Sequence, residues 1–115
     1  MGIDAVDVAR FALILRRRES FEERVFTALE RSICGGTPGR LAARFAAKEA
    51  TMKALGVGLG AFGFHDVWVE REESGRPVLR VEGRAAALAA AAGVSRWHVS
   101  LTHTHLVAEA VVVAE

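Results

Sequence analysis

The chain has 115 residues, enough for one domain with its own core and too few for two. Hydrophobic residues make up 51% and charged residues 25%, which excludes a disordered, fibrous or low-complexity chain. A net charge of +1 and the absence of tyrosine argue against non-specific nucleic-acid binding, and no apolar run is as long as a membrane span.

The first half of the chain predicts a short strand and three helices, over residues 2–8, 6–15, 21–33 and 40–55. Apolar residues at three- and four-residue spacing indicate the helices, and a glycine-rich breaker at 35–39 precedes the third. Because only Met1-Gly2-Ile3 precedes Asp4, we expect the strand that contains Asp4 to be short. Consecutive arginines at 16–18 follow the first helix.

The second half has the two-residue period typical of strands. Two apolar runs on either side of 73–77 predict a hairpin, and an alanine-rich stretch predicts a helix over 83–92. Two further strands are predicted at 97–103 and 106–113, and their apolar content predicts central strands covered on both faces. We therefore predict an α+β fold, an antiparallel sheet packed with helices, in one domain over 1–115.

Cys34 is the only cysteine, which excludes an intrachain disulfide and thiolate zinc clusters. The first residues do not have the pattern of a signal peptide, so the expected location is the cytoplasm.

The predicted helix over 40–55 lacks a solvent face. Its large apolar residues form one stripe, and the opposite side carries Ala43, Ala47, Ala50 and Ala54, which suit close packing against another element. Charges flank the apolar stripe, at Arg44, Lys48, Glu49 and Lys53. Because buried charge is costly unless it is paired, we expect these groups to meet a polar ligand or each other in a cleft. The alternative is that Glu49 and Lys53 form a routine i, i+4 ion pair.

Three other features are compatible with a phosphate or metal site. Gly56, Gly58 and Gly60 let backbone N–H groups approach a phosphate, although such spacing also occurs in ordinary turns. His103 ends a strand and is either a ligand-binding residue or a satisfied core histidine. Asp4 in an apolar strand needs a partner, and together with Glu49 it offers the two oxygen ligands that Mg²⁺ takes from proteins when a phosphate supplies others.

Several sequence blocks resemble the bacterial holo-acyl-carrier-protein synthases, the short trimeric type within the 4′-phosphopantetheinyl transferase superfamily. They are GID at 2–4, RVFT at 24–27 with Glu30, RFAAKEA at 44–50 with Lys53-Ala54, GRP at 75–77 and HVSLTHT at 98–104. The order and spacing match nearly end to end. The resemblance implies the 4′-phosphopantetheinyl transferase fold and an enzyme that transfers 4′-phosphopantetheine from coenzyme A to a serine of apo-acyl carrier protein.

By the same resemblance, Asp4 and Glu49 hold Mg²⁺, with Mn²⁺ as the alternative ion, and Glu49 and Lys53 are catalytic. Glu49 is the expected general base, acting through a metal-bound water, with unassisted water as the alternative. Arg44 and His103 approach the ribose 3′-phosphate and Lys53 the pyrophosphate. The implied coenzyme A-binding residues are Arg44, Lys48, Lys53, Gly56, Gly58, Pro77, Ser100, His103 and Thr104.

The resemblance also implies the partners. Acyl carrier protein is contacted by Arg10, Ile14, Arg17 and Arg24, and the chain forms a homotrimer with active sites between subunits; for the arginines, the alternative is a solvated basic face. No membrane or nucleic acid is implied. One departure concerns the segment 33–36, which is often basic in the family but reads ICGG here, so one phosphate-contacting lysine is missing. The alternative function is a non-catalytic module that binds coenzyme A or a carrier protein, and a purely structural trimer is a third.

Overall fold

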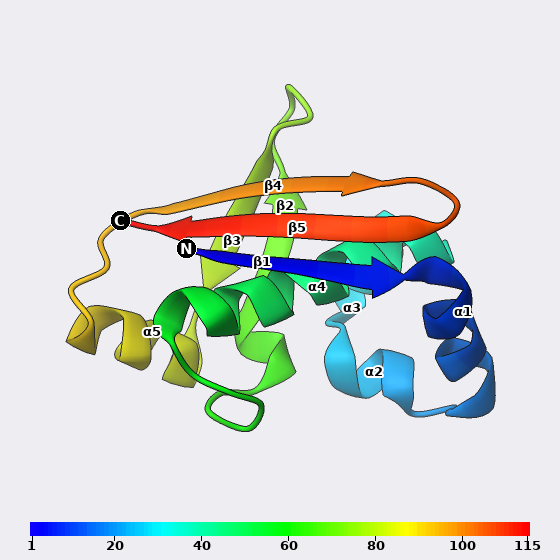
Figure 1. Cartoon of the computed structure of the whole chain (residues 1–115), viewed down its shortest axis with the longest axis horizontal. Coiled ribbons are helices and arrows are strands. Elements are labelled where there is room, and N and C mark those ends of the chain that lie inside the picture. The colour runs from blue at the N-terminus through cyan, green and yellow to red at the C-terminus, as the bar shows by residue number, and fades with distance from the viewer.

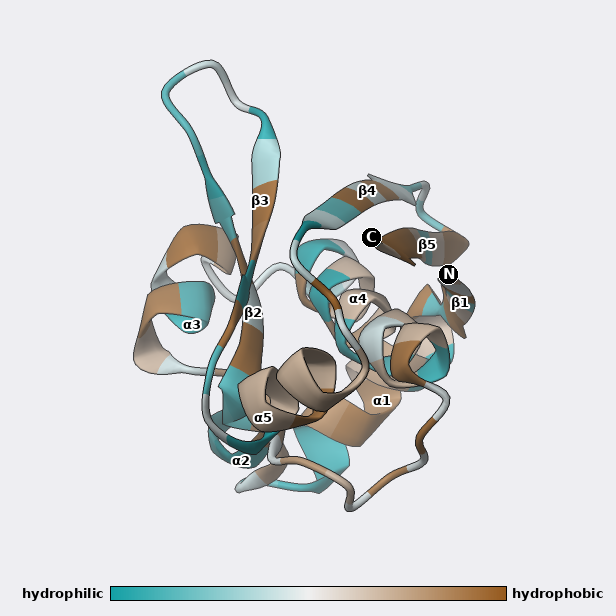
Figure 2. Ribbon diagram, turned by 90° about the vertical axis from the view of Figure 1, so that its left-hand side faces the viewer, coloured by the Kyte–Doolittle hydropathy of each residue, from teal (hydrophilic) through white to brown (hydrophobic).

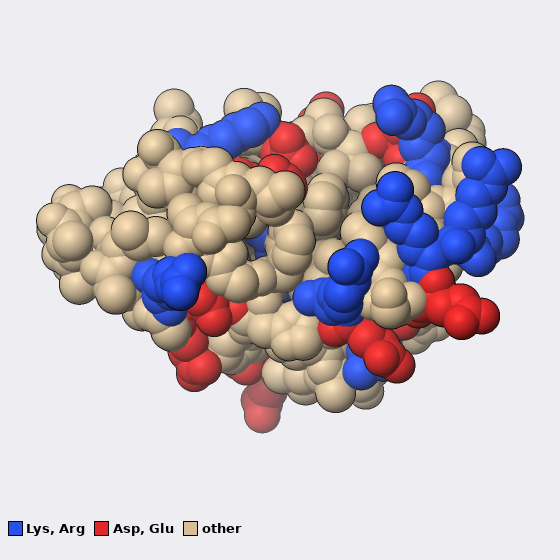
Figure 3. Space-filling model, turned by 90° about the horizontal axis from the view of Figure 1, so that it is seen from below, with Lys and Arg blue, Asp and Glu red and all other residues tan.

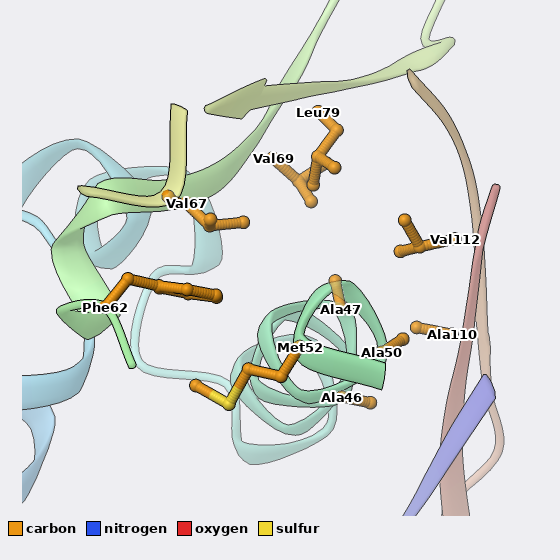
Figure 4. Packing of buried hydrophobic residues seen from close by; sticks show 11 residues of the cluster. Ala46, Ala47, Ala50, Met52, Phe62, Val67, Val69, Leu79, Ala110 and Val112 are labelled. Atoms are coloured by element: carbon orange, nitrogen blue, oxygen red, sulfur yellow. The ribbon is translucent and has the colours of Figure 1, made fainter. Parts of the chain in front are cut away.

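The longest helix, α4 (Pro38–Leu55), lies at the centre of a computed structural model that describes residues 1–115. A three-stranded antiparallel sheet covers one side of α4 and a two-stranded hairpin lies on the other (Figures 1 and 4). The main core forms between these layers, where Ala47 and Ala50 of α4 pack between hairpin residues such as Val69 and sheet residues such as Val112 (Figure 4). The predicted α+β fold is confirmed.

The three-stranded sheet has the order β1 (Gly2–Asp7), β5 (Val107–Ala114), β4 (Trp97–His103). Asp4 and Leu101 are both register partners of Ala110, so their side chains share the face that packs on α4. The prediction of two central strands is confirmed for β5 and wrong for β4, which is an edge strand. The expected cover on both faces is also wrong, because α4 covers only one face of the sheet (Figure 1). Alternating burial along β5 follows from this one-sided cover.

Small residues allow β1 and α4 to approach closely. Ala47 and Ala50 are fully buried, which confirms that the alanine side of this helix packs against another element. Gly2 lies so close to α4 that a Cβ atom there would be 2.0 Å from the carbonyl oxygen of Ala50. This contact fixes β1, and therefore Asp4, against the helix that carries Glu49.

A pair of short helices replaces the single helix predicted over 21–33. The structure has α2 (Phe21–Val25) and α3 (Ala28–Cys34), separated by Phe26 and Thr27. The Thr27 side chain accepts a hydrogen bond from the Glu30 N–H, and the Glu30 carboxylate accepts one from the Thr27 N–H. This capping box starts a new helix at Ala28, so the prediction of one helix is wrong.

The remaining elements are close to the predicted ones. Asp7 caps α1 (Val8–Arg17) by accepting a hydrogen bond from the Arg10 N–H at 2.9 Å. A 3₁₀ turn, η1 (Phe64–Asp66), leads into the hairpin of β2 (Val67–Arg71) and β3 (Pro77–Val81), whose polar tip projects from the body (Figure 2). The alanine-rich helix α5 (Gly83–Ala91) follows. None of the helices combines the length and the apolar character needed to cross a membrane.

Candidate active site

One cavity of about 310 Å³ brings together residues that were predicted separately from three parts of the sequence. It lies between β1, α1 and α4, and Asp4 and Glu49 both line it. Arg10 and Ile14, predicted to contact a carrier protein, line the same cavity from α1. The predicted metal pair and part of the predicted carrier surface are therefore adjacent in this fold.

Lys53 is tied to the first strand. Its ammonium donates hydrogen bonds to Asp4 Oδ1 at 3.0 Å and to the Ile3 carbonyl oxygen at 2.9 Å. The Asp4 side chain is 18% exposed, whereas that of Lys53 is 55% exposed. Lys53 thus pairs across elements with Asp4, and the alternative of a routine ion pair with Glu49 along the helix is wrong.

The electrostatics around Glu49 favour neutralisation of its charge. Partial burial raises the pKa of Glu49 above its ordinary value, the neighbouring Asp4 raises it further, and Lys53 partly offsets this. Asp4 and Glu49 form a pair of carboxylates here, and no group of three acids, histidines or cysteines is arranged to hold a metal ion. Two protein oxygen ligands suit Mg²⁺ when a phosphate and waters complete its coordination, so this donor set fits the ion.

Lys48 does not take part in this cavity. Its side chain is fully buried, and the ammonium donates to Glu30 Oε1 at 2.9 Å, to the Phe64 carbonyl oxygen at 2.6 Å and to the Val67 carbonyl oxygen. All three ammonium protons are used in contacts that join α4 to α3, to η1 and to the start of β2. The prediction that Lys48 binds coenzyme A is wrong, because a ligand has no access to this group and no free donor to meet.

Arg44 is on the same side of α4 as Lys48 but closer to the helix N-terminus. It is buried and lines a separate cavity with Ile33, Arg40 and Arg71. His103 lies elsewhere, beside Pro38 and Gly39 at the start of α4. Arg44 and His103 of one chain therefore line different cavities.

His103 and Thr104 border an open cavity of about 530 Å³ between the first turns of α1 and α4. His103 is exposed, so the alternative of a satisfied core histidine is wrong. A Cβ atom on Gly39 would lie 2.9 Å from the His103 ring, which shows how closely the ring sits on α4. The Thr104 hydroxyl oxygen accepts the N–H groups of Leu106 and Val107, leaving its own hydrogen free to donate.

The other predicted coenzyme A residues are dispersed. Pro77 lines a cavity between the hairpin and β4, and Val99 borders it, whereas Ser100 is exposed and points to the opposite face of β4. Gly56 ends α4 in the left-handed conformation, with φ +69°, and its N–H donates to the Lys53 carbonyl oxygen, so its glycine is needed for the helix end. Gly58 is exposed, and a Cβ there would meet open space.

The predicted carrier-binding arginines lie at one end of the molecule. Arg17 ends α1 and Arg24 lies on the short helix α2, and both are exposed. Figure 3 shows basic side chains gathered at the end of the molecule that carries these helices. Asp7 also lines the cavity of Asp4 and Glu49 and was not predicted; an aspartate directly before a helical pattern is the cap signal that identifies it.

Comparison with known proteins identifies the family. Residues 1–112 match the family model of the 4′-phosphopantetheinyl transferase superfamily. A Frankia casuarinae protein named holo-[acyl-carrier-protein] synthase is 51% identical over 115 residues, covering 100% of this chain and 95% of that protein. A protein of the same name from Beutenbergia cavernae is 46% identical over 115 residues, with coverage of 100% and 96%.

Solved structures have the same fold. The holo-[acyl-carrier-protein] synthase of Helicobacter pylori in complex with coenzyme A has a TM-score of 0.89 and 29% identity, covering 99% of this chain and 98% of that one. The Neisseria meningitidis holo-[acyl-carrier-protein] synthase has a TM-score of 0.86 and 32% identity, with coverage of 99% and 95%. The chain therefore belongs to the 4′-phosphopantetheinyl transferase superfamily.

Proposed function

We propose that this chain transfers 4′-phosphopantetheine from coenzyme A to a serine of apo-acyl carrier protein and releases adenosine 3′,5′-bisphosphate. The observation that carries the proposal is the cavity in which Asp4 and Glu49 lie together, with Lys53 bound to Asp4. The names of the full-length relatives, and the coenzyme A bound to the Helicobacter pylori protein, support this reaction.

Asp4 and Glu49 are the proposed ligands of Mg²⁺, and Mn²⁺ would suit the same pair of carboxylates. A bound divalent cation would act as a Lewis acid that neutralises charge on the pyrophosphate of coenzyme A. Removal of either carboxylate should lower the transfer rate by about 10²-fold or more.

The reaction joins the carrier serine oxygen to the β-phosphorus and breaks the bond between that phosphorus and the bridging oxygen. Such transfers depend chiefly on positioning and on neutralisation of developing charge. Lys53 is exposed enough to leave Asp4 and donate to the pyrophosphate. Glu49 is the proposed acceptor, through water, of the proton of the serine hydroxyl.

The proposed coenzyme A contacts are divided among cavities of one chain. Arg44 and His103 line different cavities, and Pro77 lines a third. A site that joins these groups on one cofactor therefore needs residues from two copies of the chain. We propose that Arg44, Lys53, Gly56, Gly58, Pro77, Ser100, His103 and Thr104 contact coenzyme A in such shared sites.

The outer face of the three-stranded sheet is the proposed surface for a homotrimer. Ile3 is 60% exposed on this face, and its register partner Val111 is only half-buried. In Figure 1 the sheet is nearest to the viewer, with α4 behind it and no helix in front. Val111→Arg should reduce the mass measured by light scattering to that of one chain and abolish transfer. A variant that stays assembled would contradict this arrangement.

Arg10, Ile14, Arg17 and Arg24 form the proposed contact with the carrier protein. The cavity that holds Asp4 also includes Arg10 and Ile14, so a carrier bound over α1 would bring its serine to the reacting phosphate. Arg17→Glu should raise the KM for the carrier and leave coenzyme A binding unchanged, because an exposed charge acts mainly on encounter. An unchanged carrier KM at low salt would refute this contact.

The decisive experiment is incubation of apo-acyl carrier protein with coenzyme A, Mg²⁺ and the protein, followed by mass spectrometry. We expect the carrier to gain the mass of one phosphopantetheine. Asp4→Asn and Glu49→Gln should abolish this gain while circular dichroism remains that of the wild type. No mass gain despite tight binding of coenzyme A or carrier would instead assign a non-catalytic binding module.

A further inference from the structure

A second polar cavity, of about 390 Å³, lies on the opposite flank of α4 from β1. Its four lining residues come from three elements: Ile33 of α3, Arg40 and Arg44 of α4, and Arg71 at the end of β2. No carboxylate lines it, so three arginines surround the same space without a lining acid. Such a concentration of positive charge needs an anion.

Arg44 supplies the second observation. It is only 2% exposed, and its Nε donor is buried without a hydrogen-bond partner. Its one side-chain hydrogen bond is a long contact of 3.5 Å from Nη1 to the Arg40 carbonyl oxygen. Burial lowers the pKa of Arg44, and Arg71 and Arg40 lower it further, with Cys34 and Glu30 opposing them. An arginine stays protonated in a protein, so the charge remains and lacks a partner.

Arg71 is held in place beside this charge. Its Nη1 donates to the Gly75 carbonyl oxygen at 2.8 Å, within the same hairpin, which leaves its other guanidinium donors free. Arg40 is exposed in the first turn of α4. The guanidinium fork matches the oxygens of a phosphate, and three forks around one cavity suit a dianion rather than a carboxylate.

We propose that Arg40 and Arg71 complete, with Arg44, the pocket for the ribose 3′-phosphate of coenzyme A. This inference rests on the proposed function and assigns Arg40 and Arg71 as specificity-determining residues that distinguish coenzyme A from its 3′-dephospho form. The segment 33–36 borders the same cavity through Ile33 and has no basic side chain. Arg71, from the hairpin, supplies the charge that this segment lacks.

The test compares two donors in the transfer assay, coenzyme A and 3′-dephospho-coenzyme A. Arg40→Gln and Arg71→Gln should each lower kcat/KM for coenzyme A by about tenfold, because each removes a charge-assisted hydrogen bond, and should leave the value for the dephospho donor unchanged. Arg84→Gln is the matched control, since Arg84 is exposed on α5 and lines none of the cavities. It should change neither value.

Equal losses with both donors, or no loss with either, would overturn the proposal. Calorimetric titration of the same proteins with adenosine 3′,5′-bisphosphate and with adenosine 5′-monophosphate separates this pocket from turnover. We expect the wild type to prefer the bisphosphate and Arg71→Gln to lose most of that preference. If the wild type transfers nothing yet shows this pattern, the proposed function fails and the pocket stands. If the wild type binds both nucleotides equally, the pocket assignment fails, whatever the transfer activity.

Discussion

Replacing Lys48 by methionine isolates the buried ion pair between α3 and α4. The substitution keeps most of the length of the side chain but removes the ammonium that donates to Glu30, Phe64 and Val67. Glu30 is then left fully buried with a hydrogen bond from the Thr27 N–H alone, because its Oε2 atom already lacks a partner. Breaking a buried pair in this way costs about 3–5 kcal/mol.

The expected cost corresponds to a large change in Tm. A chain of 115 residues has an unfolding entropy of about 240 cal/mol/K near its Tm, so each kcal/mol lowers Tm by about 4 °C. Lys48→Met should therefore lower Tm by about 12–20 °C in a thermal scan followed by circular dichroism. Urea titration should show a lower midpoint with an unchanged m-value.

The matched control is Lys53→Met, the same substitution five residues further along α4. Lys53 also has a carboxylate partner, Asp4, but its side chain is 55% exposed, so its removal should cost less than about 1 kcal/mol. The double variant Glu30→Gln, Lys48→Met should cost less than the sum of its single changes, because it leaves no buried charge. Equal losses in the two lysine variants would refute the reasoning. At a temperature where Lys48→Met is folded, its KM for coenzyme A should be that of the wild type.

Three further changes test other parts of the structure. The pKa of Glu49 is raised above its ordinary value of 4.5, so the wild type loses stability as the pH rises from 4.5 through the raised pKa. Without metal, Glu49→Gln should therefore have a higher Tm than the wild type at pH 7. Mg²⁺ should raise the Tm of the wild type and leave that of the variant unchanged. Gly2→Ala should cost about 1–3 kcal/mol in urea unfolding because its Cβ meets the Ala50 carbonyl oxygen, whereas Gly58→Ala, in open space, should cost far less. Thr27→Ala removes the cap of α3 and should lower the unfolding free energy by about 1 kcal/mol.

The sequence predicted most elements because their local signals agree with the packing. The alanine side of α4 indicated a close neighbour, and β1 occupies that place. The error at 21–33 was avoidable: Thr27 and Glu30 have the spacing of a capping box, a stronger local signal than the apolar period that crosses it. The edge position of β4 could not be predicted, because apolar content does not show whether a strand has one or two neighbours in its sheet.

The pairing of Asp4 with Glu49 was predictable from their ligand chemistry and from the family resemblance, although they lie on different elements. The fold brings them into one cavity. Lys48 was misjudged because its partner, Glu30, comes from a different helix, and spacing along α4 cannot reveal such a contact. Arg40 and Arg71 were missed for the same reason, since only the fold places the end of β2 beside the first turns of α4.

The central helix α4 also fixes the distance between two groups of the proposed site. Glu49 and Arg44 project from different sides of one unbroken helix and are separated along its axis by about 7.5 Å. Because a helix of this length does not stretch, the spacing between the two groups is set before any donor arrives. A nucleotide whose charged groups are spaced differently can reach the site of Glu49 or that of Arg44, but not both.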